Sequence, residues 1–226
     1  MKLIISGGGE SKHFRQLDKS FISILGPNPN LLFIPLACAS DHWDDGLERI
    51  AATFSTIHFE NIEMCLDLGG LCWQYLNNFD AVYIDGGNTF QLMSKIRQTH
   101  TYELLNRFIH HGGVINGDSA GAIVLGSHLK TAHFGDAGDH NHAGLTSYQG
   151  LNLLGQWAIH AHYSKSEDAE IEHFVTEYGF PVIALHDTAG AFIDDRSLTV
   201  VGNSEVTLFH HDRKEILKPN CRTALF

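Results

Sequence analysis

The stretch NGDSAGAIVLG, residues 116–126, places a short polar turn between two apolar runs and surrounds one serine with small residues. The run that leads into the turn, from residue 113, is typical of a buried strand, and the run that follows it is typical of a helix. The turn fits the pattern G-x-S-x-G, with Ser119 between Gly117 and Gly121. A strand, a tight turn and a helix in this order form the context in which such a serine can act as a nucleophile.

Two interpretations of this turn stay open on the residues alone. In the first, Ser119 is a nucleophile held in a strained conformation, and the N–H of Ala120 is half of an oxyanion hole. In the second, the turn is an ordinary helix cap, because serine and aspartate are common at that position. A serine nucleophile needs a general base. His160 and His162 are candidates, because residues two apart on a strand face the same side.

Outward from the turn, short apolar segments alternate with amphipathic ones. Strands are expected at residues 2–6, 30–37, 56–62, 81–87 and 113–119, and helices at 41–56, 71–79, 89–98 and 101–111. This alternation predicts an α/β fold, a mostly parallel sheet with helices on both faces. From residue 182 onward, successive strands with tight turns predict C-terminal antiparallel strands added to that sheet. We expect a long loop at 127–150 and a single domain over residues 1–226.

Charge and hydropathy restrict the partners. The chain has 226 residues and a formal net charge of −11, and a nucleic-acid binder would normally show a basic stripe instead. No apolar run approaches the roughly 20 residues of a membrane helix, and the first residues lack the apolar region of a signal peptide. We therefore expect a soluble cytoplasmic protein with no nucleic-acid or membrane partner. A homodimer stays open.

The histidines raise the alternative of a metal site. His140, His142, His160 and His162 form two H-x-H pairs, and such a pair on a strand can bind zinc. The chain lacks an HExxH motif, however, and none of its four cysteines stands at CxxC spacing. We expect no metal and no other cofactor. A metal-binding or non-catalytic relative remains the alternative, since fold does not fix function.

Several motifs together resemble the peptidase E / cyanophycinase family of serine peptidases, which shares the fold of the class I glutamine amidotransferases. In chain order they are LLFIPLA (31–37), IDGGNTFQLM (84–93), NGDSAGAIVLG (116–126), IHAHYS (159–164) and VIALHDTAGAFI (182–193). They span nearly the whole chain. The resemblance implies a serine-type peptidase in which Ser119 is the nucleophile and His162 the general base. It also implies that the Gly87 N–H completes the oxyanion hole with that of Ala120.

The resemblance places the third member of the triad in the loop between the serine and the histidine. HFGDAGDHNH (133–142) offers Asp136, which spacing favours, and Asp139 as the reserve. An acid there would hold the imidazole in the right tautomer.

The same family implies the substrate. Its members include dipeptidases that take an N-terminal aspartate and enzymes that cut β-aspartyl-arginine polymers. We expect small peptides, above all dipeptides with N-terminal aspartate, and keep β-aspartyl peptides as the alternative. Asn88, His160 and Lys165 are candidates for binding a substrate carboxylate. The dipeptidase pattern has proline before the catalytic histidine, whereas this chain has Ala161.

Overall fold

A central sheet organises the computed structural model, which describes residues 1–9, 21–54, 58–136 and 138–225. Its eight strands in the described residues have the order β12-β9-β8-β1-β5-β4-β2-β3. The parallel strands are β1 (Lys2–Ser6), β2 (Asn30–Ile34), β3 (Asn61–Met64), β4 (Ala81–Ile84) and β5 (Val114–Asp118). The antiparallel strands are β8 (Ala189–Asp194), β9 (Ser197–Gly202) and β12 (Arg222–Ala224). The predicted fold class is confirmed.

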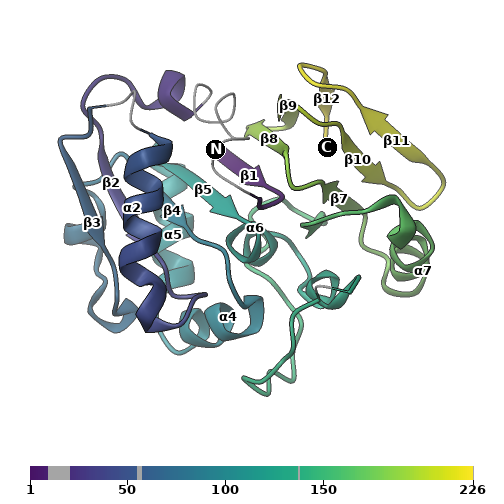
Figure 1. Cartoon of the computed structure of the whole chain (residues 1–226), viewed down its shortest axis with the longest axis horizontal. Helices are drawn as coiled ribbons and strands as arrows, with labels where there is room; N and C mark the ends of the chain where they lie inside the picture. Colours follow the sequence, from purple (N-terminus) through teal and green to yellow (C-terminus); the bar gives the residue numbers. More distant parts are fainter. Residues whose placement is uncertain (10–20, 55–57, 137, 226) are drawn as a thin grey trace.

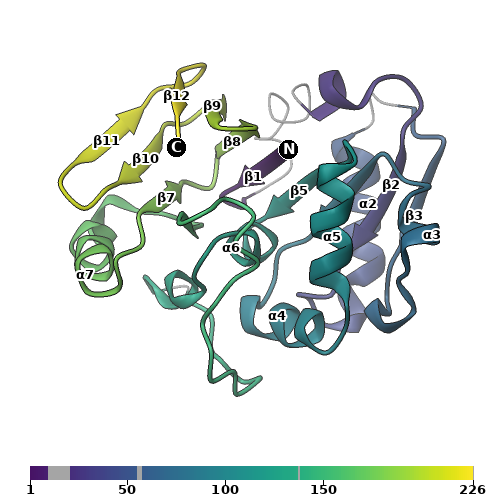
Figure 2. The ribbon, with the colours of Figure 1, turned by 180° about the vertical axis from the view of Figure 1, so that it is seen from behind.

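Helices cover both faces of this sheet, which is why its inner strands are continuous apolar runs. Helix α2 (Trp43–Thr53) lies in front of the sheet in Figure 1, and α5 (Thr101–His110) lies in front in the reversed view of Figure 2. The second face also carries α4 (Thr89–Arg97) and α6 (Ala120–Leu125), while the short α3 (Trp73–Leu76) contacts α5. Ile50 and Phe54 of the α2 region pack with Phe33 in one apolar cluster. Leu105 and Ile123 belong to the cluster on the other face.

The C-terminal half forms a second sheet that the sequence analysis did not separate from the first. Its order is β11-β10-β7-β6, from β6 (Ala158–His160), β7 (Val182–Leu185), β10 (Val206–Phe209) and β11 (Lys214–Leu217). Strand β7 pairs in parallel with β6 and antiparallel with β10, so only part of the chain after residue 182 joins the central sheet. Helix α7 (Asp168–Tyr178), which was not predicted, packs on this second sheet through Ile171, Phe174 and Val175.

Several expected elements are shorter than their patterns suggested. The helix expected over 71–79 is reduced to the four residues of α3, after the 3₁₀ turn Leu68–Gly70. Strand β3 begins later than the expected 56–62, and residues 55–57 lie outside the described ones. The described part of 127–150 is mainly irregular, with a 3₁₀ turn at Lys130–His133. A further 3₁₀ turn, Ser40–His42, precedes α2.

In the described ranges no helix is both long and apolar enough to span a bilayer.

The two sheets meet where their parallel strands end. The N–H of His162, just beyond β6, donates to the Gly7 carbonyl beyond β1 at 3.0 Å. The next N–H, of Tyr163, donates to the Leu185 carbonyl at the end of β7 at 2.9 Å. Strands β1, β4 and β5 end at the same edge, because they run parallel in register. Open α/β sheets place their sites at such an edge.

Candidate active site

The turn after β5 has the form predicted for a nucleophile elbow. Ser119 has φ 50° and ψ −111°, outside the regions that non-glycine residues normally occupy, and it immediately precedes α6. Its N–H donates to the Ser6 carbonyl at 3.0 Å, which fixes the turn to the end of β1. A Cβ at Gly121 would overlap the Ile84 carbonyl, so only glycine lets α6 begin this close to β4. The local sequence thus holds the serine hydroxyl clear of the sheet.

His162 is positioned by the N-terminal glycines. It lies beyond β6 with φ 57°, and its ring packs against Gly8, where a Cβ would overlap the imidazole. Its Nε2 lies 2.7 Å from the Ser119 Oγ, which is hydrogen-bonding distance. The structure therefore brings together the predicted nucleophile and the predicted base. His160 and His162 were expected to face the same side of one strand, but the strand ends at His160 and the two rings have different surroundings.

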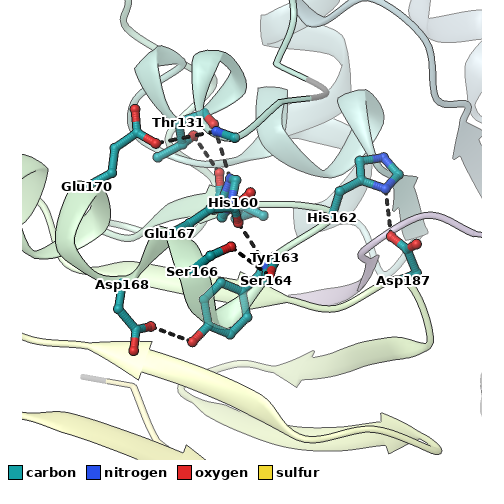
Figure 3. Close-up of polar contacts among 12 residues, drawn as sticks. Thr131, His160, His162, Tyr163, Ser164, Ser166, Glu167, Asp168, Glu170 and Asp187 are labelled. Atoms are coloured by element: carbon teal, nitrogen blue, oxygen red, sulfur yellow. Dashed lines mark hydrogen bonds and ion pairs between the residues drawn. The ribbon is translucent and has the colours of Figure 1, made fainter.

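The carboxylate that reaches the imidazole is Asp187, which corrects the expectation of Asp136. The His162 Nδ1 lies 2.7 Å from Asp187 Oδ1 (Figure 3). Both ring nitrogens of His162 are thereby occupied, so neither Asp136 nor Asp139 bonds to it. Asp136 is exposed on its loop, and Asp139 instead accepts the Thr89 N–H at 2.8 Å at the start of α4.

Asp187 was not among the predicted residues, because the family resemblance places the acid between the serine and the histidine. A signal was present: LHD (185–187) places an acid directly after a buried strand, the same position that marks Ser119 after β5. Carboxyl ends of parallel strands gather at one edge, so this aspartate was a candidate on topology alone.

A cavity of about 270 Å³ opens beside the Ser119 hydroxyl. Gly87 lines it, at the start of the loop that leads into α4. Ala120 is the first residue of α6, and the N–H groups of a first helical turn lack partners within the helix. The two predicted oxyanion donors therefore lie in the loop between β4 and α4 and at the start of α6. Apolar side chains supply much of the remaining wall: Ile123, Ala132, Phe134 and Ala161.

His160 lines this cavity, and its ring nitrogens are both hydrogen-bonded within the protein. Its side chain is 2% exposed; Nδ1 lies 3.1 Å from the Thr131 carbonyl and Nε2 lies 2.9 Å from Glu167 Oε2 (Figure 3). A backbone carbonyl only accepts hydrogen bonds. Both ring nitrogens of His160 already have partners within the protein. No N–H then remains for a substrate carboxylate, so the geometry does not support the expected binding role of His160.

Glu167 is held as a carboxylate by the same contacts. It also accepts the Ser164 N–H at 2.8 Å, which completes a capping box at the 3₁₀ turn Lys165–Glu167 before α7. Burial raises the pKa of Glu167, but the hydrogen bonds from His160 and Ser164 outweigh burial and lower that pKa below its usual value.

The other two predicted substrate contacts are not directed at the cavity. Asn88 caps α4, accepting the Gln91 N–H at 2.9 Å, and donates from Nδ2 to the His140 carbonyl at 3.0 Å. Lys165 is exposed in the turn before α7 and is not among the residues that line the cavity. The lining described at this cavity contains neither lysine nor arginine.

A second carboxylate, Asp118, is buried directly before the nucleophile. Ser6 Oγ donates to its Oδ1 at 2.5 Å, and Arg49, which pairs with Asp85, contributes a nearby positive charge. Burial raises the pKa of Asp118 and prevails over the hydrogen bond and the charge, which both lower it. Asp118 therefore carries its charge at a cost to folding.

The four histidines of the metal alternative are not gathered into one site. The rings of His140 and His142 lie 5.6 Å apart by their centroids, while His160 and His162 bond to Glu167 and Asp187. In the ranges that the structure describes, no group of three or more His, Cys, Asp or Glu side chains is arranged to hold a metal ion.

Comparison with known proteins places this geometry in a family. The model of peptidase family S51 matches residues 3–201. Peptidase E of Shewanella denitrificans is 28% identical over 209 residues, which cover 87% of this chain and 85% of that protein. Peptidase E of a Nostoc species is 26% identical over 189 residues, covering 79% and 75%.

Two solved structures share the fold. A crystal structure of a peptidase E protein from Listeria monocytogenes superposes with a TM-score of 0.69 at 21% identity, covering 88% of this chain and 96% of that one. A peptidase from an acI-B1 actinobacterium superposes with a TM-score of 0.75 at 16% identity, covering 99% and 96%.

Proposed function

The chain belongs to peptidase family S51 and is a peptidase, and from that premise we propose that it is a serine peptidase whose triad is Ser119, His162 and Asp187. One observation carries the proposal: the imidazole of His162 lies 2.7 Å from the Ser119 hydroxyl on one side and 2.7 Å from the Asp187 carboxylate on the other. Nucleophile, base and orienting acid in hydrogen-bonded series are what acyl transfer through serine requires.

In the proposed reaction, Ser119 Oγ attacks the scissile carbonyl carbon while His162 Nε2 takes the hydroxyl proton. Asp187 accepts the Nδ1–H and stabilises the imidazolium that forms. The Gly87 and Ala120 N–H groups bind the oxyanion of the tetrahedral intermediate. The intermediate then collapses: the C–N bond breaks, His162 donates its proton to the leaving amine, and an acyl-enzyme remains. Water then attacks the acyl carbon while His162 takes its proton. The ester bond to Ser119 Oγ breaks, His162 returns the proton to Oγ, and the acid is released.

The cavity beside Ser119 would hold the residue that donates the acyl group. Its volume of about 270 Å³ is large enough for one amino-acid residue. From the family resemblance we propose dipeptides with N-terminal aspartate as the first substrates. The lining described here offers no lysine or arginine for an acidic side chain, so neutral N-terminal residues belong in the same test. β-Aspartyl peptides test the alternative.

The deciding experiment compares wild type with Ser119→Ala on a panel of Asp-X, neutral-X and β-aspartyl dipeptides, with and without a chelator. We expect wild-type hydrolysis that survives chelation and falls by at least about 10⁴-fold in the variant. Thermal unfolding of both proteins shows that the variant is folded. Hydrolysis that persists in Ser119→Ala and disappears with the chelator would instead support the histidine metal alternative.

A further inference from the structure

The glycine whose N–H is proposed to bind the oxyanion lies directly beside the nucleophile. Gly87 and Ser119 line the same cavity. A Cβ built on Gly86 would lie 3.2 Å from the Ser119 Cβ, so the Gly86–Gly87 peptide passes within contact distance of the elbow. Gly87 has φ 134°, a conformation that glycine adopts readily and other residues rarely. Because glycine has no side chain to hold such a conformation, the orientation of this peptide depends on its neighbours.

The segment after β2 supplies those neighbours. The Asn88 N–H, just after the two glycines, donates to the Ala37 carbonyl at 2.9 Å. A Cβ at Gly87 would overlap the same carbonyl, so the two loops are in direct backbone contact. One side chain of the segment also takes part: the Cys38 Sγ donates to the Gly86 carbonyl at 2.9 Å.

The Cys38 contact orients the proposed oxyanion donor, because the Gly86 carbonyl and the Gly87 N–H belong to one peptide unit. In a trans peptide these two groups point in opposite directions, and the described residues contain no cis peptide bond. Holding the carbonyl toward Cys38 therefore directs the N–H away from Cys38. Gly87 lines the cavity whereas Cys38 does not. Among the described residues the Gly87 N–H has no acceptor, so it is available to a substrate oxyanion.

The surroundings of Cys38 keep its thiol protonated, as donation requires. Burial raises the pKa of Cys38, and the negative charges of Asp85 and Asp118 raise it further, while Arg49 and Lys95 act in the opposite direction. The raised pKa also argues against Cys38 as a second nucleophile, because the thiolate is the reactive form of cysteine. The thiol is thus suited to hold a carbonyl and not to attack one.

We propose that Cys38 is a positioning residue for the oxyanion hole, and that its S–H holds the Gly86 carbonyl so that the Gly87 N–H faces the tetrahedral intermediate. This inference rests on the proposed function, since Ser119 must form that intermediate. Removing an oxyanion donor outright costs about 10²- to 10³-fold in kcat. Cys38 acts through the donor and its loss leaves the donor in place, so we expect a smaller effect, about tenfold in kcat. KM should stay within about twofold, because the oxyanion is absent from the ground state.

The test compares the full chain with its variants Cys38→Ala and Cys38→Ser on the best dipeptide from the panel. Cys38→Ala should lower kcat about tenfold, whereas Cys38→Ser, whose hydroxyl can donate to the same carbonyl, should stay within about threefold of wild type. A boronic acid analogue of the acyl residue gives a second readout, because its tetrahedral adduct with Ser119 places an oxygen in the oxyanion hole. Its inhibition constant should rise in Cys38→Ala by the factor by which kcat falls.

Cys65→Ala is the matched control. It also removes a buried thiol that contacts a loop carbonyl, that of Asp67 at 3.6 Å, but Cys65 is not among the residues that line the cavity. It should therefore leave kcat unchanged. If Cys38→Ala unfolds at a lower temperature than wild type, Cys38→Val should show the same loss of kcat, because valine fills the space of the thiol without supplying a donor.

A kcat of Cys38→Ala within twofold of wild type would overturn the positioning role, and so would equal losses in Cys38→Ala and Cys38→Ser. Either result leaves the proposed function intact if Ser119→Ala is inactive. Activity that survives in Ser119→Ala would instead remove the proposed function on which the role of Cys38 rests.

Discussion

Ser119 and His162 are brought into line by backbone contacts before any substrate arrives. The serine N–H donates to the Ser6 carbonyl of β1, the histidine N–H donates to the Gly7 carbonyl, and the imidazole packs against Gly8. These contacts use atoms that every residue has, so the side chains of the site remain free to exchange protons. The side chains must supply the hydroxyl of Ser119, the imidazole of His162 and the carboxylate of Asp187.

The assignment of that acid can be tested with a pair of substitutions. Asp187→Asn should lower kcat by about 10³- to 10⁴-fold, as in a serine protease whose orienting aspartate is changed to asparagine, because an amide favours the wrong imidazole tautomer. Asp136→Asn should stay within about twofold of wild type. Steady-state hydrolysis of one dipeptide by the three proteins decides between them. A large loss confined to Asp136→Asn would restore the original expectation.

At this scale the sequence predicts the residues whose signals are local. Ser119 stands out because the strand, the turn and the helix around it are contiguous, and Gly87 because two glycines end a strand. Asp187 reaches His162 only because β7 and β6 are parallel neighbours. That pairing is a property of the sheet and not of any window of sequence. The sequence spacing that favoured Asp136 carried no information about the pairing of β7 with β6.

Among the elements, the 3₁₀ turn Lys165–Glu167 and α7 support His160, which lines the cavity beside Ser119. The capping box that starts this helical segment uses the same Glu167 oxygen that bonds His160. One carboxylate thus joins the helix start to β6, two residues before His162. Tyr163 extends the connection by donating to Asp168 at 2.6 Å (Figure 3).

Glu167→Gln should weaken this support in a pH-dependent way. Because the pKa of Glu167 is lowered on folding, its carboxylate stabilises the protein above the unfolded value near 4.5 and loses that effect as the pH falls through the lower folded value. At pH 7 we expect the variant to lose about 2 kcal/mol in the free energy of unfolding. Below about pH 4 the gap from wild type should narrow.

Urea unfolding at several pH values measures this gap. Glu172→Gln, which changes an exposed glutamate of α7, provides the control and should match wild type throughout. A gap that is the same at pH 3 and pH 7 would contradict the proposed charge interaction and would leave only a packing defect.

The element predictions failed where tertiary pairing decides the outcome. Helix α7 was not predicted, although Ile171, Phe174 and Val175 have helical spacing and pack on the second sheet. The helix expected over 71–79 is reduced to α3, which follows the 3₁₀ turn Leu68–Gly70. The strands of the central sheet were easier to predict from sequence, since burial on both faces makes them uniformly apolar.

For the molecule as a whole, the fold class follows from the sequence but the division into two sheets does not. Alternating apolar and amphipathic segments specify a parallel sheet with helices on both faces. Strands β8 and β9 join that sheet while β7 and β10 form another, and all four have similar β-rich patterns. Their partners are chosen by long-range packing, so the sequence predicted strands without predicting where each one pairs.

The free energy of folding also includes a cost from one buried charge, which a single substitution should relieve. Asp118→Asn keeps an oxygen to accept the Ser6 hydroxyl and removes the charge. Since the pKa of Asp118 is raised on folding, wild type loses stability as the pH rises through that value, and the variant does not. At pH 7 the variant should unfold about 2–4 °C higher, corresponding to about 1 kcal/mol, and should match wild type below about pH 4.

Calorimetric scans across this pH range test the expectation. Asp44→Asn, exposed on α2, controls for the loss of one negative charge from an acidic chain. A lower unfolding temperature for Asp118→Asn at pH 7 would show that Arg49 and Ser6 make the charged form of Asp118 favourable.

The positive φ angles at Ser119 and His162 affect how this protein would respond to selection for thermal stability. Both proposed catalytic residues adopt positive φ, 50° at Ser119 and 57° at His162, and such conformations cost about 1–3 kcal/mol each. Glycine at either position would relax the chain and remove the chemistry. Selection for heat resistance alone therefore acts against the site, so a thermostability screen of this protein enriches inactive clones unless hydrolysis is scored in the same round.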